Sequence, residues 1–303
     1  MTQTSFSAPV ICRPALAGDH ADVTEFCKGI WDGDDYVPEV WDDWLNDLSG
    51  LLAVAESNGH AIGCSKITLI SKGQWWLEGF RVDPKYQGRK VGSRLHNYVT
   101  DWWVENGNGT LRLMTDAGNF AVQHVCIKTG YIKTHEVCGY KAIPIAEPAH
   151  NFSLVTNIRE AAAFANMSES IQSTDGLTDF GWRIAMPDEL VFEAYFGDQA
   201  DHLHTFYWWK DKQALFSAWM NEEEDLRTLV IGVVACKLND MPALLMDARK
   251  LAAHEKFDSI FQIAFDMPQI ISQLEAAGFE KKWKRSNALV FEKKHPNRHE
   301  SPI

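Results

Sequence analysis

The sequence has few of the features that stabilise small extracellular folds. Its six cysteines include no CxxC pair and no spacing typical of a zinc site, so we expect neither a disulfide framework nor a bound metal. Cysteines scattered in this way are typical of a reducing compartment, and we expect a cytoplasmic protein. With 303 residues, the chain is long enough for two domains with separate cores, since a domain has roughly 100 to 200 residues.

Long apolar runs are also missing. No stretch approaches the ~20 apolar residues of a membrane-spanning helix, and the polar start from Met1 to Pro9 does not resemble a signal peptide. Positive charge is scarce, because 29 lysines and arginines face 41 aspartates and glutamates, which gives a net charge of -12. This charge repels nucleic-acid phosphates and anionic lipids, so we expect neither a nucleic acid nor a membrane as a partner.

The first half does contain alternating strand and helix patterns. An Asn-Gly pair at 58–59 separates two apolar runs and predicts a β-hairpin. Apolar residues recur at helical spacing over 91–103 and predict an amphipathic helix. Asp19 is placed to cap an earlier helix. The order predicted for residues 11–143 is β-α-α-β-β-β-α-β-α-β.

The segment 143–148 contains two prolines and is the best candidate for a domain boundary. It divides the chain into domains at residues 1–147 and 148–303. Beyond about residue 180, strand and helix patterns return in an order that matches part of the first half. We therefore expect the second domain to be related to the first.

The spacing of the two halves indicates an internal duplication. Adding 150 to Val91 and Asp116 gives Met241 and Asp266, so a helix-plus-strand unit has the same length in both halves. We interpret this as a diverged duplication. The alternative is an unrelated α+β domain whose elements have similar lengths.

One turn concentrates positive charge. Between Asp83 and Arg94 the sequence has four cations and one anion, a net charge of +3 within a chain of -12. The turn lies between a strand predicted to end at Val82 and the helix predicted from Val91. Backbone amides in such a turn, together with the positive end of the helix dipole, bind phosphate groups. The turn has neither the Gly-Lys-Ser/Thr ending of a Walker loop nor a GxGxxG pattern.

The residues Gln87–Gly92 resemble the acyl-CoA pyrophosphate motif of the GNAT N-acetyltransferase superfamily, Gln/Arg-x-x-Gly-x-Gly/Ala. The resemblance extends over residues 10–143. It implies an α/β (α+β) GNAT fold with a mixed, mostly antiparallel central sheet flanked by helices, followed here by a second, degenerate GNAT-like domain. Acetyl-CoA is the implied co-substrate, without a metal. Lys90 replaces the middle glycine, which suits only a turn without positive φ at that position.

A second resemblance is to the histidine N-acetyltransferase group of the same superfamily. It is carried by the residues Gly29–Pro38 (GIWDGDDYVP) and Glu78–Pro84 (EGFRVDP). That group acetylates a free amino acid and has a C-terminal extension like the one here. The resemblance implies a small amine, related to an amino acid, as the acceptor.

The superfamily also implies which residues hold acetyl-CoA. Phe80 and Val82 would offer backbone groups to the pantetheine arm, although plain strand core is an equally simple role for their side chains. Asn119 matches a position near the pantetheine, or it only caps a helix. The residues implied for the pyrophosphate are Gln87, Gly88, Arg89, Lys90, Val91, Gly92 and Ser93.

Two residues are candidates for proton transfer. Glu78 lies on the strand expected to face the acyl group and is a candidate general base; a structural pair with Arg81, or binding of the acceptor's ammonium, are the alternatives. The family's usual acid is a tyrosine four residues before a Gly-aromatic pair, and here that position holds Cys126. A thiol can protonate a leaving thiolate, but small buried cysteines usually serve only in packing.

The acidic segment 32–36 is the candidate acceptor site. Asp34, Asp35 and Tyr36, with Asp32, would hold an amine or an imidazolium, and Arg81 would bind a carboxylate. The alternative is a solvated acidic loop. The pair His202 and His204 has the spacing of two metal ligands, but without a third ligand we interpret it as incidental.

The second half does not carry the same turn. The position 150 residues beyond Gln87–Gly92 reads Lys237–Pro242, where Asp240 repels phosphate and Pro242 lacks an amide. The sequence therefore predicts an acetyl-CoA-dependent N-acetyltransferase with one cofactor site. A non-catalytic acyl-CoA-binding module is the competing hypothesis, favoured by Lys90 and by the missing tyrosine.

Overall fold

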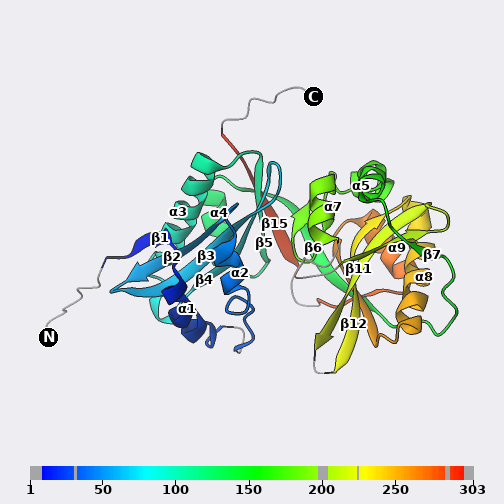
Figure 1. The fold of residues 1–303 in the computed structure, drawn as a ribbon, viewed down its shortest axis with the longest axis horizontal. Coiled ribbons are helices and arrows are strands. Elements are labelled where there is room, and N and C mark those ends of the chain that lie inside the picture. Colours follow the sequence, from blue (N-terminus) through cyan, green and yellow to red (C-terminus); the bar gives the residue numbers. More distant parts are fainter. Residues whose placement is uncertain (1–8, 31–32, 197–203, 224, 284–286, 297–303) are drawn as a thin grey trace. The chain divides into compact units, whose positions relative to one another are not determined.

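The computed structural model describes residues 9–30, 33–196, 204–223, 225–283 and 287–296 (Figure 1). The chain divides into two compact units that are not separated by a single cut. Unit 1 comprises residues 1–113, 121–132 and 292–303, and unit 2 comprises residues 114–120 and 133–291. The assignment of residues 1–147 and 148–303 as two functional domains stays a prediction.

Unit 1 is built on a sheet whose first four strands are antiparallel neighbours in sequence order. The fifth strand pairs with the fourth in parallel. Its elements, some of which end in unit 2, are β1 (Ile11–Pro14), α1 (His20–Cys27), α2 (Trp41–Asn46), β2 (Leu51–Ser57), β3 (His60–Ser71), β4 (Gln74–Val82), α3 (Val91–Asn106), β5 (Thr110–Asp116) and α4 (Phe120–Lys128). This is the predicted element order up to the last strand.

Helix packing in unit 1 follows the apolar pattern of the sequence. The residues of α3 that recur at helical spacing are buried: Val91, Leu95, Val99 and Trp103 are at most 1% exposed. The predicted hairpin at 58–59 is present as the turn between β2 and β3. The amphipathic helix and the hairpin are therefore both confirmed.

Asp19 does not cap α1 with its side chain, so that prediction was wrong. Its carboxylate instead accepts two hydrogen bonds from the Arg13 guanidinium, both 2.8 Å, and one from the Leu16 amide. A carboxylate gains more from a two-pronged contact with an arginine than from one neutral helix amide. Sequence position alone did not reveal Arg13 as a partner because the arginine reaches Asp19 from β1.

Unit 2 contains the strands β6-β13-β12-β11-β10-β7, which are hydrogen-bonded in this order and include parallel and antiparallel pairs. The strand β6 (Ile132–Ala142), expected to close the first half, pairs with β13 in unit 2. The other strands are β7 (Phe152–Leu154), β10 (Thr205–Trp209), β11 (Ala214–Glu223), β12 (Leu226–Ala235), β13 (Ser259–Phe265), and the shorter β8 (Thr178–Asp179), β9 (Ile184–Ala185) and β14 (Glu280–Lys281). The helices are α5 (Ile158–Met167), α6 (Glu169–Gln172), α7 (Glu189–Tyr195), α8 (Met241–His254) and α9 (Pro268–Ala276).

The two units share a repeated pattern of elements. In unit 1 a β-hairpin leads through β4 to a long helix, α3, and then to β5, which runs parallel to β4. In unit 2 the hairpin of β11 and β12 leads to α8 and then to β13, which runs parallel to β12. The helices α3 and α8 begin 150 residues apart, at Val91 and Met241. The expected second GNAT-like repeat is therefore present.

The C-terminal part of the chain returns to unit 1, which the sequence pattern did not indicate. Strand β15 (Ala288–Lys294) begins in unit 2 and ends in unit 1. There Glu292 pairs with Arg112 of β5 at 3.2 Å, with both side chains nearly buried. The ring of His295 packs edge-on against Trp103, and its Nε2 lies 2.9 Å from the Val104 carbonyl oxygen. These contacts attach residues 292–295 to unit 1, with His295 buried in it.

Replacing Glu292 should destabilise unit 1. The variant Glu292→Gln leaves the Arg112 guanidinium buried without its carboxylate, which costs about 3 kcal/mol of unfolding free energy. Denaturant unfolding measures this loss, with Glu105→Gln as a control, because Glu105 is exposed on α3 in the same unit. Equal stability of the two variants would show that the pair does not hold the C-terminal segment in place.

Candidate acyl-CoA site in unit 1

The candidate site is the turn between β4 and α3. It spans eight residues, 83–90, and contains a short 3-10 helix at Pro84–Tyr86. Most of its residues are exposed, as expected for a surface that binds a ligand. Gly88 has φ +74° and Lys90 has φ 62°. Both residues therefore adopt the left-handed conformation that favours glycine.

The conformation of Lys90 differs from the sequence-based expectation. From the sequence, we expect a side chain here only in a turn without positive φ at this position. In the structure, φ at Lys90 is positive. Lys90 precedes the first residue of α3 and is its N-cap, with φ 62° and ψ 15°. A left-handed conformation costs a residue with a Cβ about 1 to 2 kcal/mol, so the lysine is retained here against a local preference for glycine.

The first amides of α3 are the core of the candidate anion site. The Arg94 amide donates to the Lys90 carbonyl oxygen at 3.1 Å, which is the first hydrogen bond between residues i and i−4 in this helix. The amides of Val91, Gly92 and Ser93 precede it, where helix geometry provides no acceptor within the helix. They lie at the positive end of the helix dipole, beside Lys90. This arrangement is suited to a phosphate or pyrophosphate group.

The edge of β4 provides a second recognition surface. Among the described residues, the register pairs β4 with β5 only over Gln74–Trp76, whereas β4 continues to pair with β3 as far as Val82. Beyond Trp76 the two parallel strands diverge. Beyond that point β5, as far as the structure describes it, does not pair with the backbone of β4, and the Phe80 carbonyl oxygen accepts from the Arg81 side chain at 3.2 Å. Such an edge is suited to an extended ligand, as a sheet edge is suited to an added strand.

Gly92 brings the helix start close to this strand edge. A Cβ built at Gly92 would lie 3.5 Å from the Phe80 ring and 3.6 Å from the Val82 side chain. These are ordinary contact distances, so the start of α3 packs directly on the last residues of β4. The structure thus places Gly92 against Phe80 and Val82, three of the residues predicted to contact acetyl-CoA.

Glu78 is held by a neighbouring hydroxyl. The Thr68 Oγ1 on β3 donates to the Glu78 Oε1 at 2.6 Å. The next residue, Gly79, has φ +59°, and a Cβ there would lie 2.4 Å from the Trp44 ring. The register between β3 and β4 shifts at this point, so Gly79 sits in a β-bulge that only glycine fits. Sequence analysis missed Thr68. The bulge determines which side chain of β3 lies opposite Glu78, and the only sign of the bulge in the sequence is Gly79.

The acidic segment and Arg81 come together in the structure. Both Asp35 oxygens accept from the Arg81 guanidinium, at 2.6 and 3.1 Å, and the Asp35 side chain is 1% exposed. The guanidinium also lies over the Tyr36 ring, 5.5 Å from its centroid. Asp34 is exposed beside this pair. Asp35 and Arg81 therefore neutralise each other, and Asp34 and Tyr36 are the exposed members of the group.

Cys126 is buried in α4. Burial raises the pKa of its thiol to about 12, so the sulfur keeps its proton at neutral pH. On neighbouring elements, His96 of α3 packs against both Phe80 and Tyr131, and burial lowers the pKa of His96 to about 4. His96 is therefore neutral, with its Nε2 2.9 Å from the Thr129 hydroxyl.

The remaining candidates are Asn119, Asp32, His202 and His204. Asn119 precedes α4, is exposed, and belongs to unit 2. Its role near a pantetheine stays a prediction. Asp32 and His202 fall outside the described residues, and His204 is buried in unit 2, stacked on Trp219 with ring centroids 4.3 Å apart.

Metal-ligating side chains do not cluster in the described part of the chain: no three His, Cys, Asp or Glu residues there come close enough to share an ion. All six cysteines are free thiols. Within the same residues, no helix combines the length and apolar character needed to cross a bilayer.

Comparison with known proteins identifies the class to which the first repeat belongs. Residues 20–131 match the model of the Acetyltransferase (GNAT) family. The matched segment runs from the start of α1 to the end of α4 and includes the turn and the β4 edge described above. The resemblance seen in the sequence is therefore confirmed, and this segment is a GNAT acetyltransferase domain.

Curated relatives give a narrower likeness. The chain is 30% identical over 85 residues to a histidine N-acetyltransferase of Xenopus tropicalis, an alignment that covers 28% of this chain and 26% of the relative. It is 32% identical over 87 residues to the probable N-acetyltransferase 16 of Homo sapiens, an alignment that covers 28% of this chain and 24% of the relative. The alignments thus span about a quarter of the length of these relatives.

Solved structures extend the likeness in fold over both repeats. A putative acetyltransferase from Thermoplasma acidophilum superposes with a TM-score of 0.57 at 14% identity, covering 94% of this chain and 99% of the other. A tandem GNAT protein from the clavulanic acid biosynthesis pathway has a TM-score of 0.58 at 12% identity, covering 96% and 100%. The predicted GNAT fold with a second GNAT-like repeat is confirmed.

The left-handed Lys90 has a measurable consequence. Lys90→Gly should be more stable than Lys90→Ala by about 1 kcal/mol, because both variants lose the charge but only alanine keeps the penalty of a Cβ at positive φ. Chemical denaturation of the two variants tests the difference. Lys85 is the control position, since it lies in the 3-10 helix, where alanine should be the more stable replacement. The same order at both positions would contradict the turn geometry.

Proposed function

We propose that the chain is an acetyl-CoA-dependent N-acetyltransferase that acetylates the amine of a small molecule, with a free amino acid such as histidine as the acceptor class. The observation that carries this proposal is the meeting of the open β4 edge with the cationic turn at Gly92. An extended chain ending in a polyphosphate matches these two surfaces, and acyl-CoA has this form. We also propose a cytoplasmic location, which the free cysteines favour.

The residues of the turn divide the binding of acetyl-CoA between them. The amides from Arg89 to Ser93 suit the pyrophosphate, and the side chains of Gln87, Arg89 and Lys90 surround it with polar and positive groups. Gly88 keeps the turn open, because nothing lies within 4 Å of the position where its Cβ would stand. Backbone groups of Phe80 and Val82 suit the amide groups of the pantetheine arm. When bound, acetyl-CoA would supply the acetyl thioester.

Glu78 is the proposed general base. Its carboxylate lies on the strand that carries the open edge, and the Thr68 hydroxyl orients it. A carboxylate in this place can accept a proton from the acceptor's ammonium or amine, directly or through water. Thr68 is then a positioning residue, because it acts on the acceptor only through Glu78.

Cys126 is the proposed proton donor for the departing thiolate. The raised pKa keeps the Cys126 thiol protonated at neutral pH but also makes it a weaker acid than an ordinary thiol, and the side chain is fully buried. After donation, the proton that the amine releases on acetylation would have to return to the Cys126 sulfur before the next turnover.

The acceptor site is proposed at the acidic segment. Asp34 and Tyr36 are exposed and present a carboxylate and a ring to an amine or an imidazolium. The buried Asp35–Arg81 pair holds the segment against β4. The Arg81 guanidinium also donates to the Phe80 carbonyl oxygen at 3.2 Å, and it is proposed to turn toward an acceptor carboxylate when one binds. The relatives named as histidine N-acetyltransferases support an amino acid with a basic side chain as the acceptor.

A non-catalytic acyl-CoA-binding regulatory module is the second candidate, and the burial of Cys126 in place of a tyrosine favours it. A thiol-release assay with acetyl-CoA and a panel of free amino acids separates the two functions. Turnover with one acceptor supports the enzyme. CoA binding without turnover on any acceptor supports the module.

Gly92→Asp tests the cofactor site. The added carboxylate would lie beside the amides of the helix start and should weaken CoA binding by about 100-fold or more, since two like charges at ~4 Å repel strongly near a protein surface. The matched control Gly92→Asn has the same shape without the charge. The contacts of 3.5 Å at this position predict that both variants fold. Equal CoA affinity of the two variants in calorimetry would contradict the site.

Glu78→Gln tests the base. It should keep CoA affinity but lower kcat by roughly 10² to 10⁴, as expected for loss of a positioned base. It should also flatten the acidic limb of the pH profile. If Glu78 instead binds the acceptor's ammonium, KM should rise with little change in kcat.

Thr68 variants separate positioning from a purely structural role. Thr68→Val should lower kcat and shift the acidic limb of the pH profile, whereas Thr68→Ser keeps the hydroxyl and should restore both.

Wild-type kinetics in Glu78→Gln would show that Glu78 is structural.

A further inference from the structure

The cleft of unit 2 that corresponds to the acyl-CoA site of unit 1 has the same strand geometry. The register pairs β12 with β13 in parallel over Thr228–Ile231, whereas β12 continues to Ala235. The two strands diverge beyond Ile231, as β4 and β5 do beyond Trp76. This divergence leaves an edge of β12 in unit 2 that an extended ligand or another chain segment can occupy.

In unit 2 the edge is occupied by the chain itself. The Ser170 amide donates to the Cys236 carbonyl oxygen at 3.0 Å, and the Cys236 amide donates to the Ser170 Oγ at 2.9 Å. The Ser170 Oγ also donates to the Val234 carbonyl oxygen at 2.8 Å. Val234 and Cys236 are two residues apart, so their backbone groups face the same edge. The Val233 amide, by contrast, is bonded to Ser217 of β11.

The turn that follows β12 is also occupied. It has five residues, 236–240, compared with eight in unit 1. The amide of Leu238 donates to the Glu169 Oε2 at 3.0 Å. A carboxylate from α6 thus lies on a backbone amide of the turn that corresponds to the phosphate-binding turn of unit 1. Glu169 and Ser170 are adjacent in the sequence, so one short segment covers both the turn and the strand edge.

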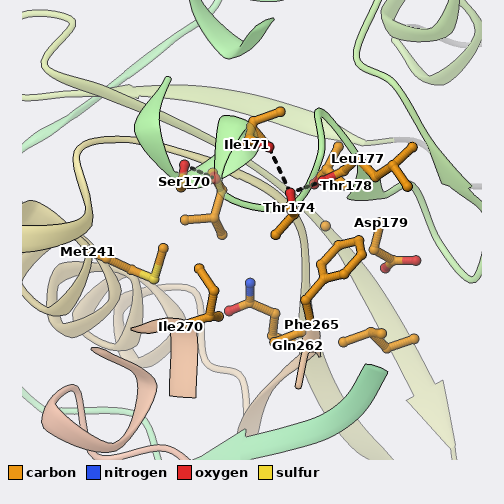
Figure 2. Close-up of a pocket in the computed structure, with 14 residues that line it drawn as sticks. Ser170, Ile171, Thr174, Leu177, Thr178, Asp179, Met241, Gln262, Phe265 and Ile270 are labelled. Atoms are coloured by element: carbon orange, nitrogen blue, oxygen red, sulfur yellow. Dashed lines mark hydrogen bonds between the residues drawn. The ribbon is translucent and has the colours of Figure 1, made fainter. Parts of the chain in front are cut away.

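What remains of the cleft is a pocket with an empty volume of about 350 Å³, part of it open to solvent. Figure 2 shows Ser170 and Ile171 of α6 on one side and Met241 and Ile270 on another, with Gln262 of β13 next to Ile270. Gly232 and Val234 of β12 also line it. The pocket therefore lies between the diverging strands, next to α6.

We propose that α6 is a built-in occupant of the second acyl-CoA cleft. Ser170 takes the hydrogen bonds of the strand edge that a pantetheine arm would make, and the Glu169 carboxylate takes the place of an anionic phosphate on the shortened turn. The cleft of unit 2 is closed to CoA by the chain's own residues as well as by the loss of the phosphate-binding sequence. Unit 2 then keeps the geometry of a cofactor site in which a peptide segment replaces the cofactor.

Hydrogen exchange at single amides tests the occupant directly on the full chain. In the wild-type protein the amides of Cys236 and Leu238 should be protected. Ser170→Ala should speed exchange at Cys236 by roughly tenfold or more, because that amide is buried. Glu169→Gln should speed exchange at Leu238 by less, because the bond between Leu238 and Glu169 is exposed. Unprotected wild-type amides, or unchanged exchange in both variants, would overturn the proposal.

The controls are matched to the two substitutions. Ser272→Ala and Glu275→Gln alter exposed residues of α9 in the same unit and should leave both amides protected. Faster exchange in the controls would mean that unit 2 opens as a whole and would overturn the assignment to α6.

CoA stoichiometry gives an independent readout, and this part rests on the proposed function. Calorimetry should find one CoA per wild-type chain and none in Gly92→Asp. If the wild-type chain binds no CoA, the proposed function fails, while the exchange result still decides the occupant. If Gly92→Asp has lost the site in unit 1 and still binds one CoA, the second cleft is open and the inference about α6 is wrong.

Discussion

The early divergence of β4 from β5 is the constraint on which the candidate site depends. Parallel strands that remain paired along their whole length have no free backbone groups between them, and a ligand could contact only side chains. Here pairing stops after Trp76, while β3 holds the other edge of β4 as far as Val82. The strand is therefore kept rigid on one side and left open on the other. This combination lets a strand act as a recognition surface without losing its own stability.

The site also depends on a local reversal of charge. A chain with a net charge of -12 repels a polyphosphate at long range, but screening limits that repulsion to about 8 to 10 Å at physiological salt. Within that distance the turn offers the amides of a helix start and the positive side chains of Arg89 and Lys90. The lysine occupies a backbone conformation that glycine would adopt at lower cost. A cation at the positive end of a helix dipole is itself unfavourable, so the charge of Lys90 offsets that cost only when an anion binds there, as proposed.

Local patterns were enough to predict most of the fold. The hairpin, the amphipathic α3, the turn and the 150-residue repeat all follow from residues close together in sequence. Asp19 was assigned the wrong partner, and the return of residues 292–295 to unit 1 was not anticipated. Both depend on contacts between segments that no periodicity connects, such as Glu292 with Arg112. In the candidate site, the motif located the turn, but the bond from Thr68 to Glu78 follows from a bulge whose position only the register reveals.

The two repeats show how one strand geometry can have two fates. A diverging pair of parallel strands leaves backbone donors and acceptors that must be satisfied, because a buried unpaired amide costs as much as a lost hydrogen bond. In unit 1 the long, exposed turn beside the edge lets a ligand or water satisfy them. In unit 2 the turn is three residues shorter, and Ser170 satisfies Val234 and Cys236 from within the chain. Once an internal segment makes these bonds, residues of the turn are no longer constrained by a phosphate, and substitutions such as Asp240 and Pro242 can accumulate without cost to the fold.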